Sequence, residues 1–113
     1  GQIVGHLLQP VEVGLAGAVG WVAGFTNSLP RTCVELYEAS IAGDVEKAVP
    51  LYKALHPLMR WDSRTEFVQA IKLSMDVVGR YGGPCRPPRL PLLPAHERSI
   101  RELTEKALAD GMG

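Results

Sequence analysis

The first part of the chain contains apolar residues at helical spacing, followed by a short continuous apolar run. Val19 to Ala23 form a short apolar run between glycines, a pattern typical of a strand that is buried on both faces of a parallel sheet. Before this run, apolar residues recur at helical spacing and predict a short helix over residues 7–16, with Pro10 tolerated only near its first turn. A helix that leads into a buried strand indicates α/β architecture at this end of the chain.

Helical patterns then follow a polar turn. Pro30 stands where a first helical position favours proline, and Gly43 stands where a helix would end, so the sequence predicts a helix over residues 30–42. Asp44 follows as an N-cap for a second helix, which should pack back on the first. We expect Pro50 to kink or divide this second helix, because proline removes a backbone donor and clashes with the preceding turn.

Two further apolar faces lie towards the end of the chain. The first predicts a helix over residues 65–78 that Gly79 can stop. The second predicts a final helix around residues 100–108. No internal repeat is visible in the sequence.

A proline-rich stretch, RYGGPCRPPRLPLLP, separates these two faces and contains five of the nine prolines. Such a stretch could be a polyproline ligand for another protein, a disordered tail or an internal connector. Leucines are interleaved with the prolines, and prolines fix the backbone at low entropy cost. We therefore expect residues 84–94 to form an extended connector across the helices, with Leu90 and either Leu92 or Leu93 buried.

Composition indicates one compact unit. The chain has 113 residues, of which 46% are hydrophobic, and its twelve basic residues balance twelve acidic ones. The charges are scattered, so nucleic acid is not an expected partner. Polar residues interrupt the apolar opening, which therefore predicts neither a membrane span nor a signal peptide. The two cysteines lie far apart and outside any CxxC pattern, which fits a reducing cytoplasm.

Potential cofactor and metal sites find little support. Gly14, Gly17 and Gly20 form GxxGxxG before a strand, whereas a dinucleotide-binding loop is GxGxxG after one. Small residues that allow close packing explain these glycines better. The three histidines have no partners at metal-ligand spacing and are expected at the surface or at helix ends: His6, His56 and His96. No metal is predicted.

Nucleophilic side chains are also isolated. Cys33 follows the helix pattern and is expected in the core, whereas Cys85 beside Arg86 is a weak candidate for a reactive thiol. Lys72 could be a catalytic amine in a dry pocket, but on a surface helix a lysine is usually solvated, and we favour that interpretation. The residues alone thus show no complete catalytic constellation.

Several ordered features together carry a family resemblance over residues 14–113. They lie in the stretches GAVGWVAGFTNSLP, LYEASIAGDVEKAVPLYKALHPLMRW, EFVQAIKLSMDVVGRYGGPCRPPRLPL and LTEKALADGMG. These stretches resemble the carboxyl-terminal part of the dihydrodipicolinate synthase and N-acetylneuraminate lyase family. Members of that family are (β/α)₈ TIM barrels followed by three helices, and they act as aldolases or dehydratases through a lysine Schiff base.

The resemblance implies a mostly helical α/β fragment. Residues 1–43 would be the end of the barrel, with strand 8 at about residues 19–23 and helix 8 at about residues 30–42. Residues 44–113 would be a C-terminal three-helix cap that includes the connector. A whole barrel needs about 250 residues, so the strands that carry the lysine, the tyrosine proton relay and the carboxylate-binding loop would lie outside this sequence.

The resemblance transfers few site residues. Val22 corresponds to the strand position whose carbonyl faces the active site, Ala23 and Gly24 follow at its mouth, and Gly5 matches the glycine that ends strand seven. The family commonly has an acidic residue after that glycine, whereas His6 follows here. These four are the expected substrate-binding residues, and no catalytic residue is expected in this chain.

The resemblance also implies a reaction for a longer parent enzyme. It would be a lyase acting on a small α-keto or imino acid such as pyruvate, with a covalent lysine imine in place of a cofactor, and a homo-oligomer, either a tetramer or a dimer. This chain alone would be inactive. The alternative is a non-catalytic helical module for oligomerisation or binding.

Overall fold

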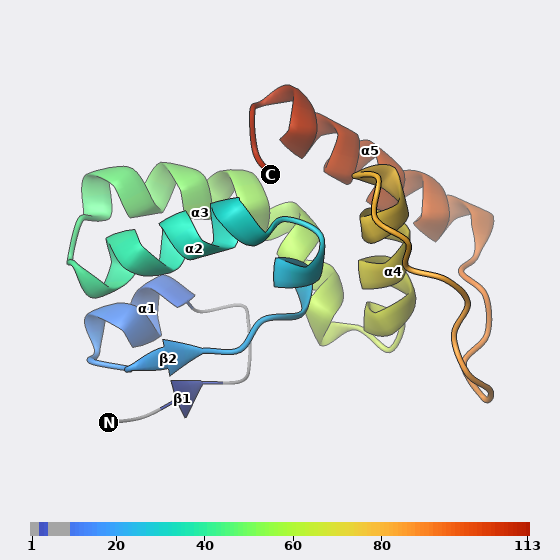
Figure 1. Cartoon of the computed structure of the whole chain (residues 1–113), viewed down its shortest axis with the longest axis horizontal. Helices are drawn as coiled ribbons and strands as arrows, with labels where there is room; N and C mark the ends of the chain where they lie inside the picture. Colours follow the sequence, from blue (N-terminus) through green and yellow to red (C-terminus); the bar gives the residue numbers. More distant parts are fainter. Residues whose placement is uncertain (1–2, 5–9) are drawn as a thin grey trace.

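The computed structural model describes residues 3–4 and 10–113 of the chain. The elements in order are β1 (Ile3–Val4), α1 (Pro10–Leu15), β2 (Gly20–Trp21), the 3₁₀ turn η1 (Gly24–Asn27), α2 (Pro30–Ile41), α3 (Val45–Met59), the 3₁₀ turn η2 (Arg60–Ser63), α4 (Phe67–Val77) and α5 (Pro94–Ala109). Helices α2 and α3 lie side by side over α1 and the two strands, and α4 and α5 form the other side of the molecule (Figure 1).

The predicted strand forms, but it is shorter and less buried than expected. β2 pairs in parallel with β1, with Ile3 opposite Gly20 and Val4 opposite Trp21. Val19 and Val22, which flank β2, are 64% and 63% exposed, so the expectation of burial on both faces is wrong. The physical reason is that β2 has a single strand neighbour within the described residues, which leaves its flanks without a covering layer.

The glycines before β2 serve close packing and turning. A Cβ on Gly14 would lie 2.7 Å from the Ser40 Cβ, so α1 and α2 can approach closely only without a side chain there. Gly17 has a positive φ of 97° after α1, a conformation that glycine adopts without strain. Close packing, as expected, explains Gly14, whereas the turn after α1 explains Gly17. The part of the predicted first helix before Pro10 and the position of His6 lie outside the described residues.

Helices α2 and α3 follow the expected boundaries closely. Gly43 has a φ of 73° after the end of α2, and the Asp44 carboxylate accepts a hydrogen bond from the Lys47 amide at 3.2 Å. Helix α3, however, continues through Pro50 and Pro57 to Met59, so the expected division into two helices is wrong, while a kink at Pro50 stays a prediction. Buried residues on both sides of Pro50 hold the helix against the core, and this packing offsets the lost backbone bond.

Helices α4 and α5 enclose a buried polar pair. The hydroxyls of Ser74 on α4 and Thr104 on α5 lie 3.1 Å apart, and both side chains are fully buried. Gly79, with a φ of 90°, follows the end of α4 as predicted. Helix α5 starts at Pro94, earlier than the apolar pattern indicated, because proline at the first helical position is favourable.

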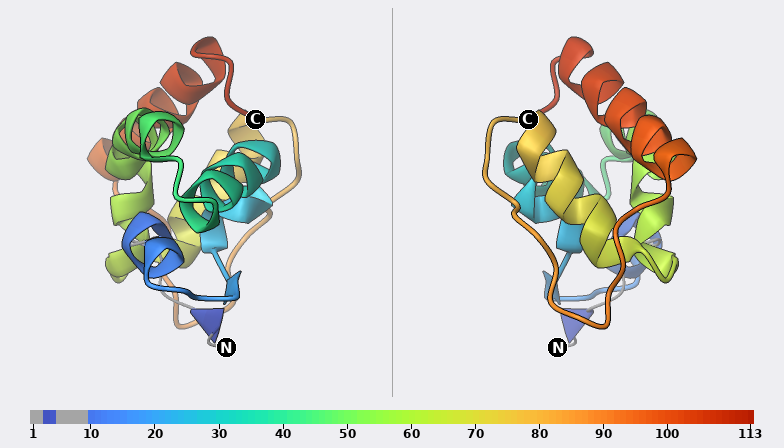
Figure 2. Two further views of the ribbon diagram at one scale, coloured as in Figure 1. Left: turned by 90° about the vertical axis from the view of Figure 1, so that its left-hand side faces the viewer. Right: turned by 90° about the vertical axis from the view of Figure 1, so that its right-hand side faces the viewer.

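The expected connector, residues 84–94, lies in the segment that runs beside α4 and turns back to enter α5 (Figure 2), and its last residue, Pro94, already begins α5. Side chains donate to its carbonyls: Lys72 Nζ to Pro84 O at 2.7 Å and Gln69 Nε2 to Leu90 O at 2.9 Å. Leu92 packs against the core. Leu90 and Leu93 are 75% and 63% exposed, so the expected burial of Leu90 is wrong. Attachment through backbone carbonyls leaves that side chain facing outwards.

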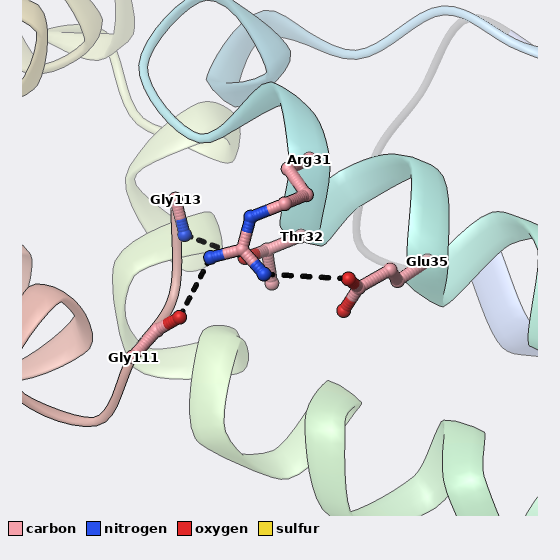
Figure 3. Close-up of polar contacts among 5 residues, drawn as sticks. All are labelled: Arg31, Thr32, Glu35, Gly111 and Gly113. Atoms are coloured by element: carbon pink, nitrogen blue, oxygen red, sulfur yellow. Dashed lines mark hydrogen bonds and ion pairs between the residues drawn. The ribbon is translucent and has the colours of Figure 1, made fainter.

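The last residues of the chain return to the start of α2 (Figure 3). The Thr32 amide donates to Gly113 O at 2.7 Å, and the Gly113 amide donates to Thr32 Oγ1 at 2.8 Å. Arg31 adds a hydrogen bond from Nη2 to Gly111 O at 2.7 Å and an ion pair with Glu35 at 3.4 Å. These contacts tie the segment after α5 to α2.

Candidate functional site

Three of the four expected substrate-binding residues lie at the carboxyl end of β2. Val22 and Ala23 follow the strand directly, and Gly24 starts η1. Val22 is exposed, Ala23 is buried and Gly24 is half-buried. Gly5 lies outside the described residues. The carboxyl ends of parallel strands are where binding sites in such sheets form, so the location suits a site, while the role of each residue stays a prediction.

The turn after β2 is held by hydrogen bonds to its carbonyls. The Thr26 hydroxyl donates to Ala23 O, and Asn27 Nδ2 donates to Gly24 O at 2.8 Å. Arg80, which follows α4, donates from Nη1 to Ser28 O at 3.0 Å. The strand end is therefore fixed both by its own turn and by a residue distant in sequence.

Gly24 lies directly against the helices that follow. A Cβ at this position would clash with Ile71 Cδ1 and would lie 2.9 Å from Asp62 Oδ1. The Asp62 oxygen belongs to η2 and the Ile71 methyl to α4, so a larger residue at this position would require both side chains to shift. Close packing therefore favours a small residue here, whether or not it also contacts a substrate.

The lysines do not form an obvious imine site. Lys47, Lys53 and Lys106 are exposed. Lys72 is half-buried rather than fully solvated, because its ammonium bonds the connector and it lines a cavity of about 350 Å³ together with Cys85. A lysine that forms an imine needs a free amine that faces the substrate in a dry pocket, whereas the Lys72 amine already donates to the Pro84 carbonyl.

The two cysteines differ in environment. Cys33 is buried, as expected, and burial, with a smaller contribution from the charge of Asp62, raises the pKa of its thiol from 9.0 to about 12. This group stays protonated and unreactive at neutral pH. Cys85 is half-buried, and both cysteines are unpaired.

The described residues hold no group of three or more histidine, cysteine or acidic side chains that could bind a metal ion. His56 and His96 instead make edge contacts with the rings of Tyr52 and Trp61. Within the described ranges, none of the helices has the length and apolar character that crossing a membrane requires.

A groove between η2 and α5 was not predicted from the sequence. It brings together Arg60 and Arg64 from one segment and Ser99 from another. The only local signal was a tryptophan flanked by arginines in RWDSR, and the contribution of α5 becomes visible only in three dimensions.

Known proteins resemble this chain over most of its length. Residues 6–107 match the dihydrodipicolinate synthetase family. The 4-hydroxy-tetrahydrodipicolinate synthase of Methanopyrus kandleri is 38% identical over 72 residues, which cover 64% of this chain and 24% of that protein. The enzyme of the same name from Acidothermus cellulolyticus is 33% identical over 95 residues, which cover 84% of this chain and 30% of that protein.

Solved structures agree in fold. Dihydrodipicolinate synthase from Oceanobacillus iheyensis superposes with a TM-score of 0.80 and 26% identity, covering 95% of this chain and 37% of that one. KD(P)GA from T. tenax, at 24% identity and a TM-score of 0.78, supports the fold alone. The chain thus spans between 24% and 38% of the length of these proteins. By its sequence and its fold, the chain belongs to the dihydrodipicolinate synthetase family.

Proposed function

We propose that this chain is the carboxyl-terminal part of a Schiff-base lyase that acts on a small α-keto or imino acid. One observation carries the proposal: the superposition on dihydrodipicolinate synthase covers 95% of this chain but only 37% of the enzyme. An almost complete match to a minor part of an enzyme is expected of a piece of the same architecture, here the last strand and helix of a TIM barrel with its C-terminal helical cap.

In this proposal the chain contributes a wall of the active site. The end of β2, residues 22–24, would lie at the mouth of the barrel, with the Val22 carbonyl directed at the substrate. The packing of Gly24 against Asp62 and Ile71 would keep this strand end in position. The imine-forming lysine and the proton-relaying tyrosine would come from earlier strands, with the lysine iminium acting as an electron sink.

A non-catalytic helical module is the second candidate. It is favoured by the core that the described residues build on their own: Phe25, Leu29, Leu36, Leu55, Met59 and Ile100 are all fully buried. A chain with such a core could serve as an oligomerisation or binding domain without catalysis. In either case we expect a homo-oligomer in the cytoplasm.

Intact mass spectrometry of the natural protein, combined with trapping, distinguishes the two candidates. The lyase proposal expects a mass roughly three times the 12.2 kDa of this chain, because the chain covers about 30% of its relatives. Incubation with pyruvate and borohydride should then add one reduced adduct to a lysine outside these 113 residues. A natural protein near 12.2 kDa without an adduct would support the helical module.

As a control, the 113-residue chain should gain no adduct on any of its four lysines. A stoichiometric adduct on Lys72 would contradict the proposal, because the chain would then form an imine without the missing strands.

A further inference from the structure

A groove separates η2 from α5. It has a volume of about 470 Å³ and is lined by Pro57, Arg60, Trp61, Ser63, Arg64, Ser99 and Leu103. None of these residues is among the expected substrate-binding residues, so the groove requires its own explanation.

Positive charge and hydroxyl groups dominate the polar lining. Arg60 and Arg64 contribute to the lining from one segment, and Ser99 contributes to it from α5. The described lining residues include no carboxylate. The Ser63 hydroxyl already donates to Arg60 O at 2.9 Å, so Ser99 is the hydroxyl donor that the groove can offer to a ligand.

Arg64 is held in place by an aromatic ring. Its guanidinium carbon lies 4.2 Å from the centre of the Trp61 ring, a cation–π contact. Trp61 is itself buried and contacts the ring of His96 at 5.1 Å. A planar cation that rests on a fixed ring loses less conformational freedom when it binds a ligand than a mobile one does.

One carboxylate competes for this cation. Glu66 Oε2 lies 3.9 Å from Arg64 Nε, and both side chains are partly exposed. An ion pair of this length at the surface is weak, so Glu66 reduces the positive charge of the groove without cancelling it. Arg60 carries no such ion pair among the described residues.

We propose that this groove binds the phosphate group of a small molecule. A tetrahedral phosphate can accept hydrogen bonds from the guanidinium groups on one wall and from Ser99 on the other at the same time. The apolar atoms of Pro57 and Leu103 would contact the body of a phosphate ester. This site is independent of the proposed lyase chemistry.

The test is an NMR titration of the 113-residue chain with inorganic phosphate at constant ionic strength. We expect saturable shifts of backbone amides at residues 60–64 and 99–103, with a dissociation constant roughly in the millimolar range. Arg60→Gln and Arg64→Gln should each weaken binding about tenfold or more, because each removes a charge-assisted hydrogen bond. Arg86→Gln, which changes the same charge on the connector outside the groove, should leave the affinity unchanged.

A further variant changes binding in the opposite direction. Glu66→Gln should tighten phosphate binding, because it removes the carboxylate that competes for Arg64. The proposal would be overturned by shifts that do not saturate, by an equal loss of affinity in Arg86→Gln and Arg60→Gln, or by acetate binding as tightly as phosphate. Each variant's amide spectrum shows whether it remains folded.

Discussion

Replacing Thr32 by valine would measure how strongly the end of the chain is tied to α2. The Thr32 side chain is 1% exposed, and its Oγ1 accepts a hydrogen bond from the Gly113 amide at 2.8 Å. Valine has nearly the same shape and keeps the backbone amide that donates to Gly113 O. It lacks the acceptor, so the substitution removes one hydrogen bond and leaves the Gly113 amide without its partner.

The magnitude follows from the burial of that amide. A buried donor that loses its partner costs about 1–3 kcal/mol. Gly113 is half-buried, so water can restore part of the interaction, and we expect the free energy of unfolding to fall by about 1 kcal/mol. For a chain of this length, such a loss lowers Tm by about 4 °C.

Urea unfolding followed by circular dichroism would give this free energy. Thr65→Val is a matched control, because Thr65 is exposed, and it should change stability by less than about 0.5 kcal/mol. In a chain shortened to end at Asp110, Thr32→Val should have a smaller effect, because the amide that it deprives of a partner is gone. An equal loss in the full and shortened chains would refute the reasoning, since it would place the effect of Thr32 elsewhere.

Three other predictions concern the core, the thiols and the strand edge. Leu55→Ala should lower the free energy of unfolding by about 2–5 kcal/mol, as truncation of a fully buried leucine does, whereas Leu90→Ala should lower it by less than about 0.5 kcal/mol. An equal loss in the two variants would mean that Leu90 is buried in solution. Iodoacetamide at pH 8 should label Cys85 and spare the buried Cys33, and rapid labelling of Cys33 in the folded chain would contradict its burial. Because the raised pKa of Cys33 favours the protonated thiol in the folded state, the free energy of unfolding should fall as pH rises from 9.0 towards about 12. Because the edge of β2 is uncovered among the described residues, sedimentation at about 50 μM should show self-association of the chain, and Val22→Lys should reduce it. A compact monomer of the unmodified chain would count against an uncovered strand edge.

Helix ends were the most predictable part of the fold, because single residues determine them chemically. Pro30 fits a first helical turn, Gly43 and Gly79 adopt positive φ angles, and Asp44 caps the next helix. Pro50 was not predictable in the same way. Its local cost indicated a kink or a break in α3, and the tertiary packing of that helix kept it continuous.

Burial in the connector could not be predicted, because an irregular segment has no period that says which side chains face inwards. Leu90 and Leu92 stand two positions apart, yet only Leu92 packs on the core. The sites differ for a similar reason. Residues 22–24 are consecutive, so the family resemblance could indicate them from the sequence, and their role stays a prediction. The groove of Arg64 and Ser99 joins separate segments and depends on how α5 packs.

The attachment of the connector has a consequence for how sequences of this kind can diverge. It is held through the carbonyl oxygens of Pro84 and Leu90, while Lys72 and Gln69 on α4 supply the donors. Every residue has a carbonyl oxygen, so substitution at Leu90 would keep the acceptor, whereas substitution at Lys72 or Gln69 would remove a donor. Evolutionary drift should therefore be tolerated in the outward-facing connector, and selection should act on the polar face of the neighbouring helix.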